Sequence, residues 1–231
     1  WSGRSFYNIY SVPYNSKGVA TGPLTKLAQS RKLNSMYHDG PATFSHDGKT
    51  MYYTRSRCHD NFLNRGAVSN ADSIVLLEIM IATNYDSEAH RFKTITPFRY
   101  NSKAYSVAHP SVTPDGEFMI FSSDKPRGQG GSDLYISNNL RGHWMQPQPA
   151  GNVINTEGDE VFPQWANDTT LFFSSDGLEG LGGLDIYKST WNRSTNTFSY
   201  PEDLDIPINS SYDDISLALS ADGGSSFFAS N

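Results

Sequence analysis

The residues with the clearest potential for chemistry are acidic side chains that recur at similar intervals along the chain. When Ala42, Pro110, Pro163 and Leu217 are aligned, the position three residues earlier holds Asp39, Val107, Glu160 and Asp214, and the position before that holds His38, Ser106, Asp159 and Asp213. Carboxylate oxygens suit Ca²⁺ or Mg²⁺, so converging carboxylates would form a weak cation site or a pocket for a cationic ligand. The candidate polar cluster, with one nearby histidine added, is Asp39, Asp159, Glu160, Asp213, Asp214, His38 and His109.

A structural role is the favoured alternative for this polar cluster. Asp side chains in turns accept hydrogen bonds from local backbone N–H groups, and the sequence contains no Asp-x-Asp-x-Asp-Gly calcium loop. The six histidines have no zinc-ligand spacing. We therefore expect no metal ion and no cofactor, apart from weak Ca²⁺ or Mg²⁺ binding at a shared mouth if the carboxylates do converge.

No set of residues combines a nucleophile, a base and an orienting group. Cys58-His59 lies in a polar segment beside Arg57, which indicates an exposed loop rather than an activated thiol. There is no Gly-x-Ser-x-Gly motif. The sequence therefore predicts that the chain is not an enzyme. The alternative is an enzyme domain, either a lyase or glycosidase that uses the acidic cluster or the gating domain of a peptidase.

The elements that position these residues form an internal repeat. "GGSDLYIS" at 130–137 and "GGLDIYKS" at 182–189 begin 52 residues apart, and each follows a segment that ends in Ser-Ser-Asp. Asp133 and Asp185 in these copies are expected to accept backbone N–H bonds, and the paired glycines to allow a tight turn. Related landmarks recur along the chain at Asp47, Asp115, Asp168 and Asp222, and at Asn34, Asn101, Asn155 and Asn209.

Each repeat contains four short alternating or aromatic runs separated by Gly, Asp, Asn or Pro, which predicts four strands. Four strands per unit of about 40–55 residues is typical of a propeller blade. We therefore expect an all-β fold, a β-propeller of four-stranded antiparallel blades in a single domain over 1–231. Residues 5–12 match the third strand of a repeat, so the N-terminal strands are expected to complete the C-terminal blade and close the ring. The four predicted blades are 40–106, 107–158, 159–212, and 213–231 with 1–39.

Composition limits the function classes. The formal net charge of −6 disfavours a nucleic-acid surface, and no apolar run approaches the roughly 20 residues that span a bilayer. The single cysteine excludes an internal disulfide.

The repeat resembles the TolB-like, WD-type β-propeller repeat of bacterial envelope proteins. "HPSVTPDGEFMIFSSDKPRGQGGSDLYIS" follows that pattern almost throughout, and "VINTEGDEVFPQW" resembles a segment of periplasmic OmpA-family (PorE-like) proteins associated with type IX secretion. The resemblance implies a periplasmic, outer-membrane-associated domain that acts as a non-catalytic scaffold for protein partners of the cell envelope. It implies no nucleic-acid partner, and membrane association only through other domains.

The first repeat departs from the pattern through an insertion at about 57–75. An irregular loop on a rigid scaffold is a common place for function, and the basic and aromatic residues there suit a protein interface. Arg57, His59, Phe62 and Arg65 are therefore the predicted partner-binding residues, with a tolerated, non-functional insertion as the alternative. Trp191 is expected in a turn, where it could contact a partner.

Overall fold

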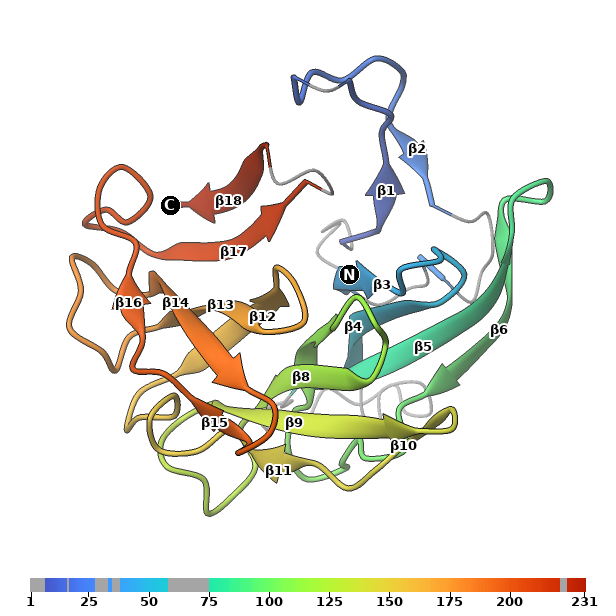
Figure 1. Ribbon diagram of the computed structural model, residues 1–231. Helices are drawn as coiled ribbons and strands as arrows, with labels where there is room; N and C mark the ends of the chain where they lie inside the picture. The colour runs from blue at the N-terminus through green and yellow to red at the C-terminus, as the bar shows by residue number, and fades with distance from the viewer. Residues whose placement is uncertain (1–6, 16, 28–32, 35–37, 58–74, 221–223) are drawn as a thin grey trace, which may run out of the picture.

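All regular structure in the described part of the chain is β-structure (Figure 1). The computed structural model describes every residue except 1–6, 16, 28–32, 35–37, 58–74 and 221–223. Across the described ranges no segment is helical, and accordingly none forms an apolar helix long enough to cross a membrane. The chain is therefore an all-β protein, as the alternating runs predict.

Three larger antiparallel sheets follow one another along the chain. The first sheet has the order β3-β4-β5-β6, the second β7-β8-β9 with β10 and β11 both on β9, and the third β12-β13-β14 with β15 and β16 both on β14. The first sheet comprises β3 (Asp39–Phe44), β4 (Met51–Arg57), β5 (Leu76–Asp86) and β6 (Arg91–Pro97). The second comprises β7 (Ala108–Val112), β8 (Phe118–Ser123), β9 (Asp133–Leu140), β10 (His143–Trp144) and β11 (Gln148–Pro149). The third comprises β12 (Glu160–Trp165), β13 (Thr170–Ser175), β14 (Asp185–Asn192), β15 (Thr197–Phe198) and β16 (Glu202–Asp203).

The first strands of the sheets lie side by side near the middle of the molecule. β7 contacts β3 on one side and β12 on the other, and β12 also contacts β17 (Asp214–Leu219). Each of these four strands has a register shift against its partner, as expected of a β-bulge. Positive φ angles at His109 (54°), Phe162 (50°) and Ser216 (65°) mark the bulge in three of them. The bulges bend the central strands and direct their side chains toward a common space.

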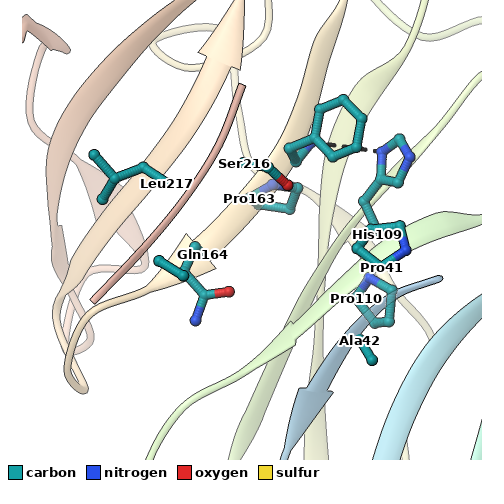
Figure 2. A pocket seen from close by; sticks show the side chains of 10 residues that line it. Pro41, Ala42, His109, Pro110, Pro163, Gln164, Ser216 and Leu217 are labelled. Atoms are coloured by element: carbon teal, nitrogen blue, oxygen red, sulfur yellow. Dashed lines mark hydrogen bonds between the residues drawn. The ribbon is translucent and has the colours of Figure 1, made fainter. Parts of the chain in front are cut away.

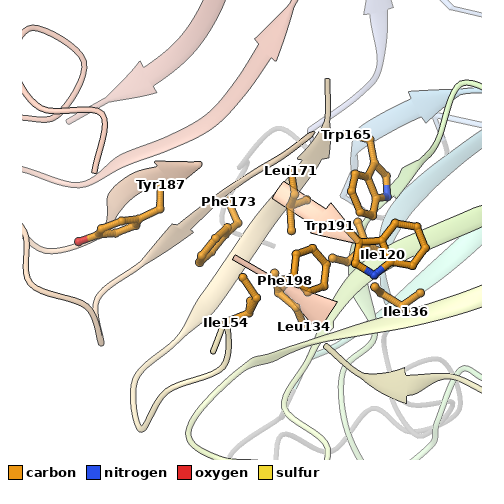
Figure 3. Packing of buried hydrophobic residues seen from close by; sticks show 10 residues of the cluster. All are labelled: Ile120, Leu134, Ile136, Ile154, Trp165, Leu171, Phe173, Tyr187, Trp191 and Phe198. Atoms are coloured by element: carbon orange, nitrogen blue, oxygen red, sulfur yellow. The ribbon is translucent and has the colours of Figure 1, made fainter. Parts of the chain in front are cut away.

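Aromatic and aliphatic side chains fill the space between the second and third sheets (Figure 3). Trp191 lies at the centre of this cluster and is fully buried, which corrects the expectation that it sits in a turn. Strand β14 continues through Asn192, so Trp191 points inward, with its ring 4.6 Å from that of Phe118 and 5.4 Å from that of Trp165. Alternation along a strand, rather than distance from a turn, decides the burial of this residue.

The repeated asparagines have a structural role that explains their spacing. The side chain of Asn155 accepts a hydrogen bond from the N–H of Leu134 (2.9 Å) and donates one to its carbonyl (3.1 Å). The carboxamide thus presents the same donor and acceptor as a peptide group and pairs with the strand as a neighbouring strand would. The same pair of bonds joins Asn34 to Ile9, Asn101 to Ile79 and Asn209 to Ile186.

The expected strand pairing between the two ends of the chain does not form in the described residues. β1 (Tyr10–Ser11) pairs with β2 (Thr25–Lys26), and β17 pairs with β18 (Ser226–Ser230), as two separate two-stranded sheets. Figure 1 shows the blue β1–β2 hairpin standing apart from β18. The hairpin reaches β18 through side chains instead, with the Tyr14 and Phe227 rings 6.2 Å apart. Residues 5 and 6 of the predicted closing strand lie outside the described residues.

Candidate functional site

One residue in each link, one or two positions before the first strand of a sheet, binds the same kind of backbone group. Asp159 accepts a hydrogen bond from the N–H of Ser132 (2.6 Å), and Asp213 accepts one from the N–H of Leu184 (3.0 Å). His38 Nδ1 and Ser106 Oγ accept the corresponding N–H groups of Tyr7 (3.1 Å) and Leu77 (3.2 Å). Carboxylate, imidazole and hydroxyl groups therefore perform one task, which is to fasten each link to the start of a third strand.

The acidic residues one position later are buried and bind groups of their own sheet, although Oδ1 of Asp214 has no hydrogen-bond partner among the described residues. Glu160 accepts hydrogen bonds from the N–H and hydroxyl of Thr156 (2.8 and 2.6 Å) and from the hydroxyl of Ser175 (2.8 Å). Asp214 binds the N–H and hydroxyl of Ser210 in the same manner (2.6 and 2.9 Å). Asp39 forms an ion pair with Arg55 instead, at 2.7 Å. Each carboxylate is thus occupied by its own sheet.

The pKa values of these acids follow their surroundings. Burial raises the pKa of Glu160, and the hydrogen bonds from Thr156 and Ser175 only partly oppose that shift. Burial also acts to raise the pKa of Asp214, but hydrogen bonds from Ser230 and Ser210 outweigh it, so the pKa is lowered. Among the described residues, no group of three His, Cys, Asp or Glu side chains is arranged to hold a metal ion. The local structural role, which the sequence favoured for these acids, fits these contacts.

The paired glycines of the repeat allow a close approach between neighbouring sheets. A Cβ on Gly131 would lie 2.4 Å from Oδ1 of Asp159, and one on Gly183 would lie 2.2 Å from Oδ1 of Asp213. Neither glycine has a positive φ, so packing rather than turn geometry excludes a side chain here. Asp133 and Asp185 do accept backbone N–H bonds, from Gln129 and Leu181.

A small central pocket lies where the four first strands meet (Figure 2). Its volume is about 90 Å³, and its wall includes Pro41, Pro110 and Pro163. The His109 ring stacks on Phe162 with centroids 4.0 Å apart, and its Nδ1 lies 2.9 Å from the hydroxyl of Ser122. Burial lowers the pKa of His109 to about 4. His109 is therefore neutral near pH 7 and lies in the wall of this central pocket.

The predicted partner-binding loop falls largely outside the described residues. His59, Phe62 and Arg65 belong to the undescribed range 58–74, and nothing is inferred about their positions. Arg57 is described, and it pairs with Leu76 at the end of the β4–β5 ladder. That end also carries Asp39, which pairs with Arg55. The insertion thus leaves the first sheet at the end where the links lie.

A second pocket, larger than the central one, contains none of the predicted site residues. It has a volume of about 330 Å³ at the boundary between the first and second sheets, and it is lined chiefly by aromatic side chains and one lysine. We call it the tyrosine pocket. The residues of its wall used below are Tyr100, Tyr105, Val107, Phe121, Ser123, Lys125, Tyr135 and Gln146. Two differences from the third repeat mark it in the sequence: Val107 stands where that repeat has Glu160, and Lys125 stands where it has Gly177.

Comparison with known families and with curated proteins gives no match. Solved structures with a similar arrangement include TolB from Acinetobacter baumannii, with 16% identity and a TM-score of 0.49 over 90% of this chain and 39% of that one. A puromycin-hydrolyzing peptidase from Mycobacterium tuberculosis has 13% identity and a TM-score of 0.47, over 84% of this chain and 35% of the peptidase. A luciferin-regenerating enzyme has 12% identity and a TM-score of 0.39, over 72% and 60%. The chain spans less than two thirds of each of these structures.

The comparisons bear on two predictions from the sequence. A TolB-like arrangement is among the similar structures, in line with the sequence resemblance, whereas nothing found supports a link to OmpA-family proteins or to type IX secretion. Enzymes are also among them, as the peptidase and the luciferin-regenerating enzyme illustrate. The prediction that the chain is not an enzyme is therefore contradicted: it relied on missing motifs and on a fold that enzymes also use. The activities of those enzymes are statements about those proteins only.

Proposed function

We propose that the chain is a four-bladed propeller domain that binds a protein partner through the end of the sheets where the links lie. We call this end the link face, and define it by His38–Asp39, Ser106–Val107, Asp159–Glu160, Asp213–Asp214 and the turns that contact them. In this proposal β3, β7, β12 and β17 are the inner strands. The β1–β2 hairpin supplies the outer half of the fourth blade.

The assignment of the N-terminal hairpin is supported by contacts that match those of the other sheets. The N–H of Asp39 donates to the carbonyl of Tyr7 (3.0 Å), as the N–H of Glu160 does to Ser132 (2.6 Å). Asn34 holds Ile9 as Asn155 holds Leu134. Residues 7–11 are thus bonded to the next link in the way a third strand of a blade is.

Deletion of residues 1–12 tests the four-bladed ring. Loss of β1 removes the backbone bond from Asp39 to Tyr7 and leaves β2 without its strand partner, and an uncovered strand edge promotes aggregation. Size-exclusion chromatography and a thermal melt of the deletion variant provide the measurement. A soluble variant that unfolds cooperatively would count against closure by this hairpin.

The observation that carries the binding proposal is a set of exposed apolar side chains on the link face. Tyr7 is 77% exposed, Tyr212 62% and Leu181 49%. Leu181 and Tyr212 belong to segments in contact, because a Cβ on Gly182 would lie 2.3 Å from the carbonyl oxygen of Tyr212. Aromatic residues are enriched in protein interfaces, and the 58–74 insertion leaves the first sheet at this same end.

A capture experiment with matched variants tests the binding surface. The chain serves as bait in a cell-envelope extract, beside Leu181→Ala with Tyr212→Ala and beside Phe62→Ala with Arg65→Ala. Tyr200→Ala is the control, because Tyr200 is equally exposed but lies beside the outer strands β15 and β16. Capture should fall in both double variants at an unchanged melting temperature. Loss only in the Tyr200 variant would move the interface to the outer strands. The periplasmic location and a type IX secretion partner rest on the residue pattern alone and stay predictions.

A further inference from the structure

The tyrosine pocket exists because two repeat residues are replaced at the boundary between the first and second sheets. Val107 and Glu160 are equivalent, since their N–H groups donate to Leu77 (2.9 Å) and Ser132 (2.6 Å) at the start of a third strand. Glu160 fills its boundary with a carboxylate bound to Thr156 and Ser175. Val107 has no such group, so the space in front of Ser123 stays open.

The second replacement is Lys125 for Gly177. Both follow an aspartate that accepts a link N–H, at 2.5 Å from Ser106 to Asp124 and at 2.6 Å from Asp159 to Asp176. A Cβ on Gly177 would lie 1.8 Å from the hydroxyl of Thr156. The link therefore packs directly onto Gly177 in the third sheet. The side chain of Lys125 excludes that packing in the second sheet and leaves a cavity of about 330 Å³.

The polar groups of the tyrosine pocket are available to a ligand. In the described part of the chain, the hydroxyls of Tyr100, Tyr105 and Tyr135 make no hydrogen bond. Tyr187, which is equivalent to Tyr135 in the third sheet, donates to the carbonyl of Glu179 (2.8 Å). Lys125 makes no ion pair among the described residues, and its Nζ lies 5.6 Å from the centre of the Tyr135 ring. The amide of Gln146 adds a further donor and acceptor.

Two cations lie at the tyrosine pocket, Lys125 in its wall and Arg99, which lies 5.0 Å from the centre of the Tyr100 ring. Asp133 places negative charge near Tyr135, but its carboxylate and that of Asp124 accept backbone N–H groups, from Gln129 and Ser106, and form no ion pair with Lys125. The ammonium group of Lys125 is thus left to bind an anionic group of a ligand. A ligand carboxylate beside Lys125 would form a charge-assisted hydrogen bond.

We propose that the tyrosine pocket binds an acidic sugar, with the ring on a tyrosine face, the carboxylate on Lys125 and the hydroxyls on the free phenols. A saturated sugar ring has an apolar face that packs on an aromatic ring, and its several hydroxyls match the number of free donors. An aromatic carboxylate would use Lys125 but would leave most of the phenols unpaired. The cavity volume lies within the range of about 300–1,000 Å³ typical of ligand pockets.

Titration with three small probes tests this proposal on the full chain. The probes are glucuronate, neutral methyl glucoside and benzoate. Ligand-observed NMR and calorimetry measure the binding of each. Glucuronate should bind saturably with a Kd on the order of 1 mM, and at least about tenfold more tightly than either other probe. Absence of saturable glucuronate binding, equal binding of the glucoside, or tighter binding of benzoate would overturn the assignment.

Variants assign the binding to this pocket. Lys125→Ala should weaken glucuronate binding about tenfold by removing the charged donor, and Tyr105→Phe should weaken it by a smaller factor. Lys103→Ala is the control, because Lys103 is an exposed lysine in the segment between β6 and β7 that carries Tyr100 and Tyr105, and it does not line the pocket. Unchanged affinity in both Lys125→Ala and Tyr105→Phe, with melting temperatures like that of the unaltered chain, would overturn the proposal.

Discussion

Two boundaries between neighbouring sheets are built from equivalent repeat positions, but one is closely packed and the other contains a pocket. Between the second and third sheets, Glu160 is bound on both oxygens and Thr156 packs against Gly177. Between the first and second sheets, Val107 and Lys125 occupy the equivalent positions and the tyrosine pocket opens. The difference shows how a repeat protein can acquire a site: the residues that seal a boundary are replaced while the strand pairing stays intact.

Exchange of the residue types at the two boundaries should have the largest effect. Gly177→Lys forces a side chain into a position where even a Cβ lies 1.8 Å from the Thr156 hydroxyl, and overpacking of this kind costs about 3 kcal/mol. Lys125→Gly removes an exposed side chain from the open boundary and should cost less than about 1 kcal/mol. Urea unfolding of both variants measures the contrast. Similar losses of unfolding free energy in the two variants would contradict the account in which the second–third boundary is closely packed and the first–second boundary is open.

Removal of an asparagine that binds a third strand should also cost more unfolding free energy at the closely packed boundary than at the open one, with a smaller difference between the two. Asn155→Ala leaves the buried N–H of Leu134 without a partner, whereas its carbonyl keeps the bond from the N–H of Ala150 (2.9 Å), so the change should cost about 2 kcal/mol. Asn101→Ala exposes the corresponding groups of Ile79 where the link is only partly buried. Water can replace the side chain there, so a loss of about 1 kcal/mol is expected. The free energy of unfolding from denaturant titration measures both, and an equal loss would show that water does not reach the open boundary.

Burial of His109 in the wall of the central pocket makes the free energy of unfolding depend on pH. Burial lowers its pKa from 6.5 to about 4 in the folded chain, so between these values the unfolded chain binds a proton that the folded chain does not. The resulting stability is present above about pH 6.5 and is lost as pH falls toward 4, by up to about 3 kcal/mol. The difference in unfolding free energy between the unaltered chain and His109→Gln, measured from about pH 7 to about pH 4.5, isolates this group. A difference that does not change with pH would contradict the assigned burial.

The sequence predicts the parts of the fold that repeat and misses the parts that depend on contacts between distant residues. The regular spacing of Asn101, Asn155 and Asn209 has a shared structural cause, because each asparagine binds the third strand of its own sheet. The acidic links were also located, and their local hydrogen bonding was the favoured alternative. The pairing of residues 5–12 with the last strands could not be judged from the sequence, because it depends on how two ends far apart in the chain approach each other.

The tyrosine pocket was missed for a different physical reason. In the sequence, its two key positions show only that residues of the third repeat are missing: Val107 stands in place of a carboxylate, and Lys125 stands in place of a glycine that permits close packing. A cavity is a property of the space between residues, and Tyr100, Phe121 and Tyr135 come from three separate segments. Comparison of equivalent positions along the repeat identifies such a site only after the sealed boundary has been seen.

Thiol labelling at one pair of equivalent serines tests the contrast between the two boundaries most directly. Ser123 lines the tyrosine pocket, and Ser175 is bound to Glu160 at the sealed boundary. In a Cys58→Ser background, Ser123→Cys and Ser175→Cys are each labelled with a small maleimide, with labelling in urea as the reference for intrinsic reactivity. Ser123 is 4% exposed and its hydroxyl donates to the carbonyl of Ser106, whereas Ser175 is fully buried. We predict that Ser123→Cys reacts at least about tenfold faster than Ser175→Cys in the folded chain, because the pocket admits the reagent at Ser123 and closed packing limits reaction at Ser175 to rare local openings. Equal protection of the two thiols would contradict an open boundary between the first and second sheets.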